Sequence, residues 1–177
     1  FGWDGTKWVQ QAKLLPSDTT SGQCFGQWVA IDGDTVVVGA WYANINGKAY
    51  AGAAYVFQRN QGGPNKWGQV KKLVASDGAA NDHFGTQVAI DGDVIAVGAF
   101  DADPKGASSG AVYVFERNSG GTNNWGQTQK LTAADGAAGL AARAGDAPPA
   151  TAVAVVSALA GCVDAGTAAV SVLAAGF

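Results

Sequence analysis

One ten-residue stretch occurs twice in this chain, first as Phe25-Gly26-Gln27-Trp28-Val29-Ala30-Ile31-Asp32-Gly33-Asp34 and then, further along, as Phe84-Gly85-Thr86-Gln87-Val88-Ala89-Ile90-Asp91-Gly92-Asp93. Repetition at a fixed period is the signature of solenoids, propellers and other arrays. If these stretches belong to such an array, the sequence around them should repeat as well.

Two further blocks keep nearly the same offset. Ala53-Ala54-Tyr55-Val56-Phe57-Gln58-Arg59-Asn60 returns as Ala111-Val112-Tyr113-Val114-Phe115-Glu116-Arg117-Asn118. Trp67-Gly68-Gln69 returns at the same offset as Trp125-Gly126-Gln127. Three blocks that keep their register, with a single residue of difference in loop length, identify two tandem copies of a unit of about 58 residues.

Each copy predicts four short strands, which in the second copy are residues 69–74, 86–90, 94–98 and 111–115. The first alternates polar and apolar residues, as an exposed strand does, and the last is apolar throughout, as in a strand covered on both faces. The Asp-Gly step of Asp91-Gly92-Asp93 is a strong hairpin signal, because glycine accepts a positive φ. Four antiparallel strands per repeat with glycine-rich turns predict an all-β fold of β-propeller blades.

The order of these motifs resembles a known family. Phe-Gly, Val-Ala-Ile, Val-Gly-Ala (Val38-Gly39-Ala40 and Val97-Gly98-Ala99) and Gly-Ala-x-Tyr-Val-Phe together resemble FG-GAP repeats, the blades of integrin α-subunit propellers and of many bacterial surface proteins. The resemblance implies a binding or adhesion propeller at the cell surface. Integrin-type blades often carry a calcium loop of the Asp-x-Asp-x-Asp-Gly type. The three-residue turns here are too short to surround a cation with six or more oxygens, so we expect blades of the shorter, calcium-free bacterial type.

The repeats set the expected organisation of the chain. We expect residues 1–7 to end a preceding blade, 8–66 to form one blade, and 67–124 a second. Residues 125–177 would add the first strand of a third blade and an Ala- and Val-rich tail. Propellers commonly need four to eight blades to close, so we interpret the chain as a partial propeller that needs further blades or neighbouring subunits.

The tail beyond residue 137 leaves several alternatives open. It could be a degenerate third blade, although Pro148-Pro149 opposes a central strand, or one or two helices, because alanine is the best helix former. A membrane span over residues 150–177 is long enough, but Asp164 near its centre argues against it. A shifted reading frame after Ala138 would also explain the abrupt loss of aromatic residues.

Composition excludes some classes of function. The chain has 177 residues, with 11 basic and 14 acidic residues and a net charge of −3, so no basic stripe is available to neutralise nucleic-acid phosphates. Its two cysteines, Cys24 and Cys162, cannot form a disulfide framework. The single histidine, His83, corresponds to Cys24 in the first repeat, and we interpret it as a loop residue. We predict no catalytic residues and no enzyme.

The best ligand-contact candidates follow the Val-Gly-Ala strands, at a loop edge where propellers often present binding surfaces. They are Trp41 and its repeat equivalent Phe100, with Asp101 and Asp103 directly behind. A less favoured alternative is that Asp101 and Asp103 hold a hard cation such as calcium with acids and amides of a neighbouring loop (Asp77, Asn81, Asp82). Loop acids more often cap their own turns, so we predict neither a metal site nor a cofactor.

Three functions compete on this evidence. We favour a non-enzymatic binding or adhesion scaffold, extracellular or on the cell surface, with a protein or glycan ligand and without nucleic acid or membrane as a partner. The alternative is a structural subunit of a larger, membrane-associated assembly, docked through the Ala-rich tail. The third, an enzyme with its active site in other blades, has little support because the acids found here are isolated.

Overall fold

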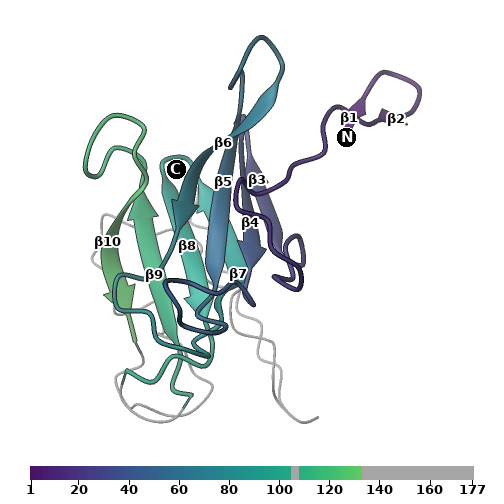
Figure 1. Ribbon diagram of the computed structural model, residues 1–177. Helices are drawn as coiled ribbons and strands as arrows, with labels where there is room; N and C mark the ends of the chain where they lie inside the picture. Colours follow the sequence, from purple (N-terminus) through teal and green to yellow (C-terminus); the bar gives the residue numbers. More distant parts are fainter. Residues whose placement is uncertain (105–107, 133–177) are drawn as a thin grey trace, which may run out of the picture.

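The computed structural model describes residues 1–104 and 108–132, and this part of the chain contains ten strands and no helix (Figure 1). No segment of it is therefore a helix able to cross a membrane. The strands are β1 (Gly2–Trp3), β2 (Trp8–Val9), β3 (Val29–Asp32), β4 (Thr35–Ala40), β5 (Ala53–Arg59), β6 (Trp67–Leu73), β7 (Phe84–Asp91), β8 (Val94–Ala99), β9 (Ala111–Glu116) and β10 (Gly126–Leu131).

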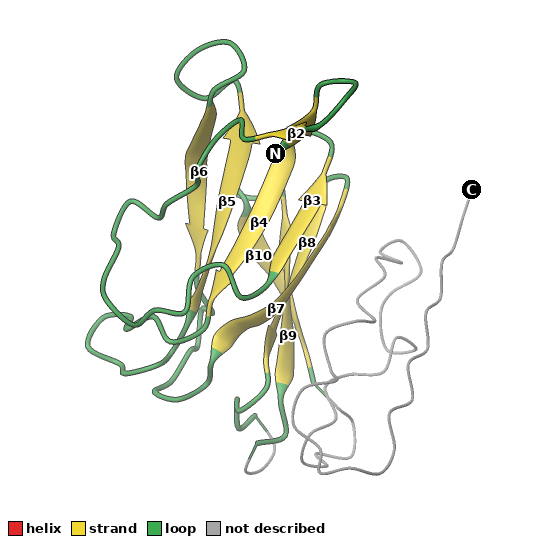
Figure 2. Ribbon diagram, turned by 90° about the vertical axis from the view of Figure 1, so that its right-hand side faces the viewer, coloured by secondary structure: helices red, strands yellow, loops and turns green. Residues whose placement is uncertain are grey.

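Eight of the strands form two four-stranded antiparallel sheets. The first sheet has the order β3-β4-β5-β6 and the second β7-β8-β9-β10, so each strand pairs with its neighbour along the chain. The two sheets lie face to face (Figures 1 and 2). The prediction of propeller blades built from four antiparallel strands is confirmed.

The Asp-Gly-Asp motifs form the expected hairpins. Asp32 pairs with Thr35 across Gly33-Asp34, and Asp91 pairs with Val94 across the equivalent turn. Gly33 and Gly92 have φ values of 51° and 54°, in the left-handed region that glycine enters without steric cost. The two repeats thus build the same turn from the same residues.

The place of β6 in the fold corrects one expectation. We predicted that residues 69–74 would begin the second four-stranded unit, but β6 pairs with β5, with Arg59 opposite Trp67, and completes the first sheet. The physical reason is that the loop after Arg59 turns the chain back antiparallel to β5. The sequence repeats predicted at 8–66 and 67–124 and the observed sheets are therefore offset by one strand.

The first nine residues form a separate small hairpin, which projects from the body in Figure 1. Gly2 pairs with Val9 and Trp3 with Trp8, the register found between Gln58-Arg59 and Trp67-Gly68 at the tip of β5 and β6. The assignment of residues 1–7 to the end of a preceding blade stays a prediction.

Each sheet has two faces, which we call front and back. On the first sheet, Tyr55 and Phe57 lie on the front face with Val36 and Val38, and Ala54 and Val56 lie on the back face with Val37 and Leu73. The front face of the second sheet packs on the back face of the first in one buried cluster. That cluster includes Phe84, Ile95, Val97, Tyr113, Phe115 and Trp125.

Glycines let the two backbones approach closely at one end of this junction. The Phe84-Gly85 pair crosses the ends of β4 and β5, where the amide of Phe84 donates to the carbonyl of Ala51 at 3.0 Å. A Cβ on Gly39 would lie 2.0 Å from the Gly85 carbonyl oxygen, and one on Gly52 would lie 2.0 Å from that of Phe84. The Phe-Gly motif of the second repeat and the Val-Gly-Ala motif of the first therefore meet in one contact. A residue larger than glycine does not fit at Gly39 or Gly85.

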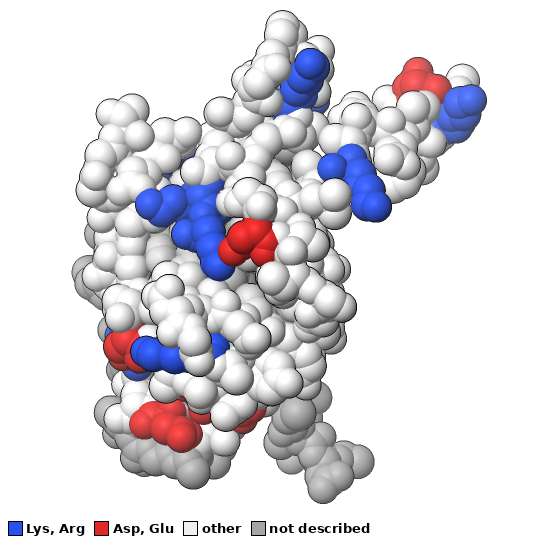
Figure 3. All heavy atoms as spheres, in the orientation of Figure 1, with Lys and Arg blue, Asp and Glu red and all other residues white. Residues whose placement is uncertain are grey.

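Charged side chains are scattered over the face of the molecule that Figure 3 shows. Basic and acidic groups lie beside one another there. Ion pairs of the described residues include Lys72 with Asp18 and Lys130 with Asp77, each at 2.6 Å. Over the described residues, this face therefore carries no broad patch of a single charge.

Some expectations for the C-terminal tail have no counterpart in the described fold. The degenerate blade, the helices and the membrane span considered for residues beyond 137 lie outside the described residues. The Ala-rich tail that we considered as a docking segment also lies outside the described residues.

Candidate ligand site at the junction of the two sheets

Five rings gather at one end of the junction between the sheets and form what we call the aromatic cluster. Three belong to the first sheet, following β4 or lying in the connection to β5, and two lie next to the ends of β7 and β8. They are Trp41, Tyr42, Tyr50, His83 and Phe100.

His83 lies at the centre of the cluster. Its imidazole is stacked on Phe100 at 5.3 Å between centroids and 10° between planes, and on Tyr50 at 6.3 Å and 18°. Trp41 meets it edge-on at 5.3 Å and 62°, and Tyr42 lies 5.4 Å away. Such offset and edge contacts are the arrangements that aromatic quadrupoles favour.

A carboxylate fixes the orientation of the imidazole. His83 Nδ1 lies 2.8 Å from Asp101 Oδ2, with both side chains partly buried. The amide of His83 donates to the carbonyl of Tyr50 at 3.1 Å, which joins the loop before β7 to the first sheet. The pair therefore holds a ring in place between two sheets. A nucleophilic site would instead need a serine, threonine or cysteine hydroxyl or thiol bonded to the imidazole.

The backbone at two of these positions is unusual for large residues. His83 and Tyr50 have φ values of 56° and 53°, a region in which non-glycine residues are uncommon and cost about 1–3 kcal/mol. The repeat-equivalent residues Cys24 and Ser108 have nearly the same φ, 53° and 49°. The conformation thus belongs to the repeat, whereas the aromatic side chains do not, since the equivalent positions hold Cys24 and Ser108.

The structure brings together three of the four residues that the sequence singled out. Trp41 and Phe100 lie 6.4 Å apart between ring centroids, and Asp101 bonds the histidine between them. Asp103 does not join them, because its carboxylate accepts a hydrogen bond from the amide of Ser108 in its own loop. Whether these residues contact a ligand stays a prediction.

Sequence reasoning missed Tyr42, Tyr50 and His83. We interpreted His83 as a loop residue, which describes its position but misses its contacts, since its partners come from different segments of the chain. A usable signal was present: the position equivalent to His83 holds a different residue, Cys24, in the first repeat. A difference between repeats in an otherwise regular pattern marks a residue that the shared fold does not require.

The acids considered for a cation have separate partners. Asp77 accepts hydrogen bonds from the Tyr113 hydroxyl at 2.9 Å and from Lys130 at 2.6 Å, and Asp82 accepts one from the amide of Ala79 at 2.7 Å. Burial raises the pKa of Asp82. In residues 1–104 and 108–132 no three acidic, histidine or cysteine side chains lie together in a way that could hold a metal ion.

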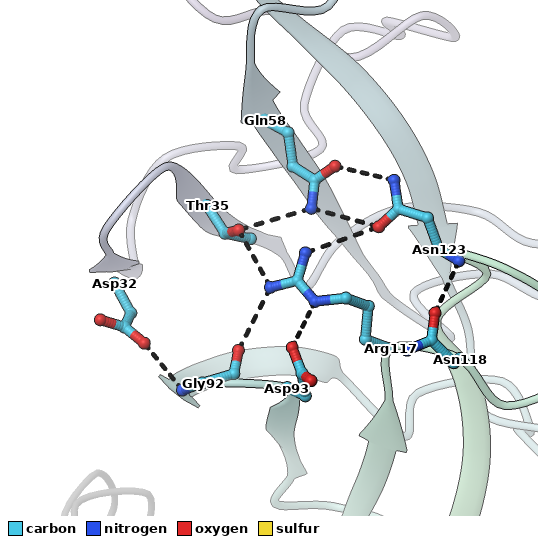
Figure 4. A network of polar contacts seen from close by, with 8 residues as sticks. All are labelled: Asp32, Thr35, Gln58, Gly92, Asp93, Arg117, Asn118 and Asn123. Carbon is cyan, nitrogen blue, oxygen red and sulfur yellow. Dashed lines mark hydrogen bonds and ion pairs between the residues drawn. The ribbon is translucent and has the colours of Figure 1, made fainter.

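A second polar region lies at the opposite, hairpin end of the junction. Arg117 is its centre: its Nε donates to Asp93 at 2.5 Å and its Nη2 donates to Thr35 of the first sheet at 3.4 Å (Figure 4). Asn123, in the loop between β9 and β10, exchanges hydrogen bonds with Gln58 of the first sheet, at 2.9 and 3.3 Å.

The hairpin turns take part in this network too. The amide of Gly92 donates to Asp32 at 2.7 Å, and these residues border an open cavity of about 410 Å³. Four of the charged side chains that line this cavity are paired with one another: Asp34 with Arg59, and Asp93 with Arg117. We interpret it as a clamp between the sheets, in keeping with the prediction that these acids are turn residues.

Comparison with known proteins agrees with the fold. The family model described as FG-GAP repeat matches residues 8–57 and 67–115, together more than half of the chain. Both matches begin at the tryptophan that opens a strand, Trp8 of β2 and Trp67 of β6. Both end at the phenylalanine of the Tyr-Val-Phe motif, in β5 and β9. No curated protein shows a significant match to the chain.

Proposed function

Because the chain belongs to the FG-GAP repeat family, whose propeller domains are generally non-catalytic, we propose that it is a binding scaffold that contacts a protein or glycan ligand through the aromatic cluster. The observation that carries this proposal is the gathering of five rings around His83, two of them, Trp41 and Phe100, at equivalent positions of adjacent blades. Rings at the surface of a rigid sheet junction give contact area at little entropic cost.

The cluster is accessible as well as ordered. Tyr50 is 45% exposed, and Trp41, Tyr42 and Phe100 are half-buried. A fold can bury rings between its sheets for stability alone, as it does with Tyr113 and Phe115. Rings that are ordered by neighbours and still reach solvent are the kind that binding surfaces use.

We further propose an extracellular or cell-surface location and a role in adhesion. The support is the resemblance of the repeats to those of integrin α subunits and bacterial surface proteins. Labelling of intact cells with a membrane-impermeant reagent tests the location.

Arrays of glycans and of cell-surface protein ectodomains, probed with the labelled full chain, test the binding role. We expect binding to at least one ligand that is lost in Tyr50→Ala and kept in Trp8→Ala. Trp8 is a suitable control because it is 68% exposed and lies in the separate β1–β2 hairpin. Equal binding by both variants would show that the cluster is not the contact site.

A further inference from the structure

We propose that the ligand of the aromatic cluster is a neutral saccharide, seated against the exposed Tyr50 side chain and the adjoining edge of the cluster; this rests on the binding function proposed above. The chemistry is stacking of the apolar C–H face of a sugar on an aromatic ring, with its hydroxyls bonded to polar groups beside the rings. Tyr50 is the most exposed residue of the five.

The spacing of the rings decides that the ligand lies on the cluster rather than inside it. Trp41 and Tyr42 have centroids 3.9 Å apart, and Tyr42 and Tyr50 are 4.9 Å apart. These are packing distances, which leave no room for a group between the rings. An aromatic cage for a quaternary ammonium needs rings that surround the cation, so this class of ligand does not fit.

The polar groups beside the rings favour hydroxyl donors. Asp101 uses Oδ2 for His83, so within the described part of the chain its Oδ1 is left for a ligand. Carboxylates accept hydrogen bonds and, when ionised, cannot donate them. A proline-rich peptide offers mainly carbonyl acceptors, and the indole N–H of Trp41 already donates to Gln27 at 2.5 Å.

The local charge argues for a neutral sugar over an anionic one. Asp101 follows β8 at this edge, and a sialylated or sulfated sugar would bring further negative charge to it. Lys48, in the connection that carries Tyr50, already donates to the carbonyl of Gly78. His83 would act as a positioning residue, since it holds Tyr50 and Phe100 in nearly parallel planes without itself being the exposed surface.

The test uses the full chain and an array with three sets of probes: neutral oligosaccharides of glucose, galactose, mannose, xylose and N-acetylglucosamine; sialylated and sulfated oligosaccharides; and polyproline peptides. We expect binding to a neutral sugar, weakened about tenfold in Tyr50→Ala and less than threefold in Tyr50→Phe, since stacking depends on the ring. Trp8→Ala should bind as the unchanged chain does. Circular dichroism melting shows that each variant is folded.

The outcomes separate this proposal from the binding function itself. Binding of polyproline or of anionic sugars alone, lost in Tyr50→Ala, would overturn the neutral saccharide and leave the binding function in place. Saccharide binding that Tyr50→Ala does not change would overturn the site. A chain that binds none of the neutral sugars would also overturn the proposal, while ectodomain binding through Tyr50 would still support a binding scaffold.

Discussion

The two repeats share their sequence motifs and their strand order but differ in what covers their front faces. In the second sheet, Val88 and Ile90 pack against the buried cluster between the sheets. Their equivalents in the first sheet, Val29 and Ile31, are 56% and 64% exposed. The apolar character of this face is therefore a property of the repeat, and its burial depends on a neighbouring sheet.

The Phe-Gly motif shows the same contrast at one residue. Gly26 and Gly85 have φ values of 92° and 94°, so both adopt the conformation needed for docking. A Cβ on Gly85 would lie 2.2 Å from the Ala53 carbonyl oxygen, whereas one on Gly26 would meet nothing within 4 Å. The repeat thus forms its docking conformation before a partner is present, which lowers the entropic cost of adding a sheet.

The largest effect is expected at the phenylalanines of this motif. Phe84 is fully buried between the sheets, and Phe25 is half-buried although it makes the same edge contacts, with Tyr55 and Phe57, that Phe84 makes within its own sheet. We expect Phe84→Ala to lower the free energy of unfolding by about 4 kcal/mol and Phe25→Ala by about 2 kcal/mol.

Equilibrium unfolding in urea measures both values. Phe25→Ala is the matched control, because it removes the same atoms from the same motif without the inter-sheet contact. Equal losses would show that the junction adds nothing to the stability of the second repeat.

A smaller difference is expected at the glycines. Alanine at either position must adopt an unfavourable positive φ, which costs about 1–2 kcal/mol. Gly85→Ala must in addition push against the Ala53 carbonyl, so we expect about 3 kcal/mol in total against about 1–2 kcal/mol for Gly26→Ala. Thermal melting ranks the two, and a melting point for Gly85→Ala at or above that of Gly26→Ala would contradict the close approach.

Much of this architecture is predictable from the sequence. The apolar run 111–115 and the Asp-Gly turns correctly predict buried strands and hairpins, because these signals are local. The sheet that β6 joins was not predictable from the period, since a tandem repeat has no marked beginning. That information lies in the loop between Arg59 and Trp67, whose ends pair directly.

The candidate site, too, has a part that the sequence predicts and a part that it does not. The sequence singles out Trp41 and Phe100 because both follow the Val-Gly-Ala strand, at a loop edge where propellers often present binding surfaces, and the fold places their rings 6.4 Å apart. The difference between His83 and Cys24 marks the position in the sequence, but the contacts of His83 could not be predicted, because Asp101 is 18 residues away and the rings that pack on it belong to two sheets. Only the folded junction brings these segments together.

The smallest effect is expected in a contact that both repeats make within their own sheets. Asp18 accepts hydrogen bonds from Tyr55 at 2.8 Å and Lys72 at 2.6 Å, and Asp77 accepts them from Tyr113 and Lys130 at 2.9 and 2.6 Å. Partial burial would raise the pKa of each carboxyl, but the bonds from lysine and tyrosine outweigh it, and both pKa values are lowered.

A lowered folded-state pKa means that the stabilisation is present above the unfolded pKa, near 3.9, and is lost as the pH falls towards the folded value. Both carboxylates are about half-exposed, at 45% and 52%, so each contributes only about 0.5 kcal/mol. We expect Asp18→Asn and Asp77→Asn to reduce the loss of stability between pH 7 and pH 3 by the same small amount, measured as unfolding free energies in urea. A clearly larger change for Asp77→Asn would contradict this expectation. It would show that packing between the sheets strengthens the Asp77 contact, so that the contact differs between the two repeats.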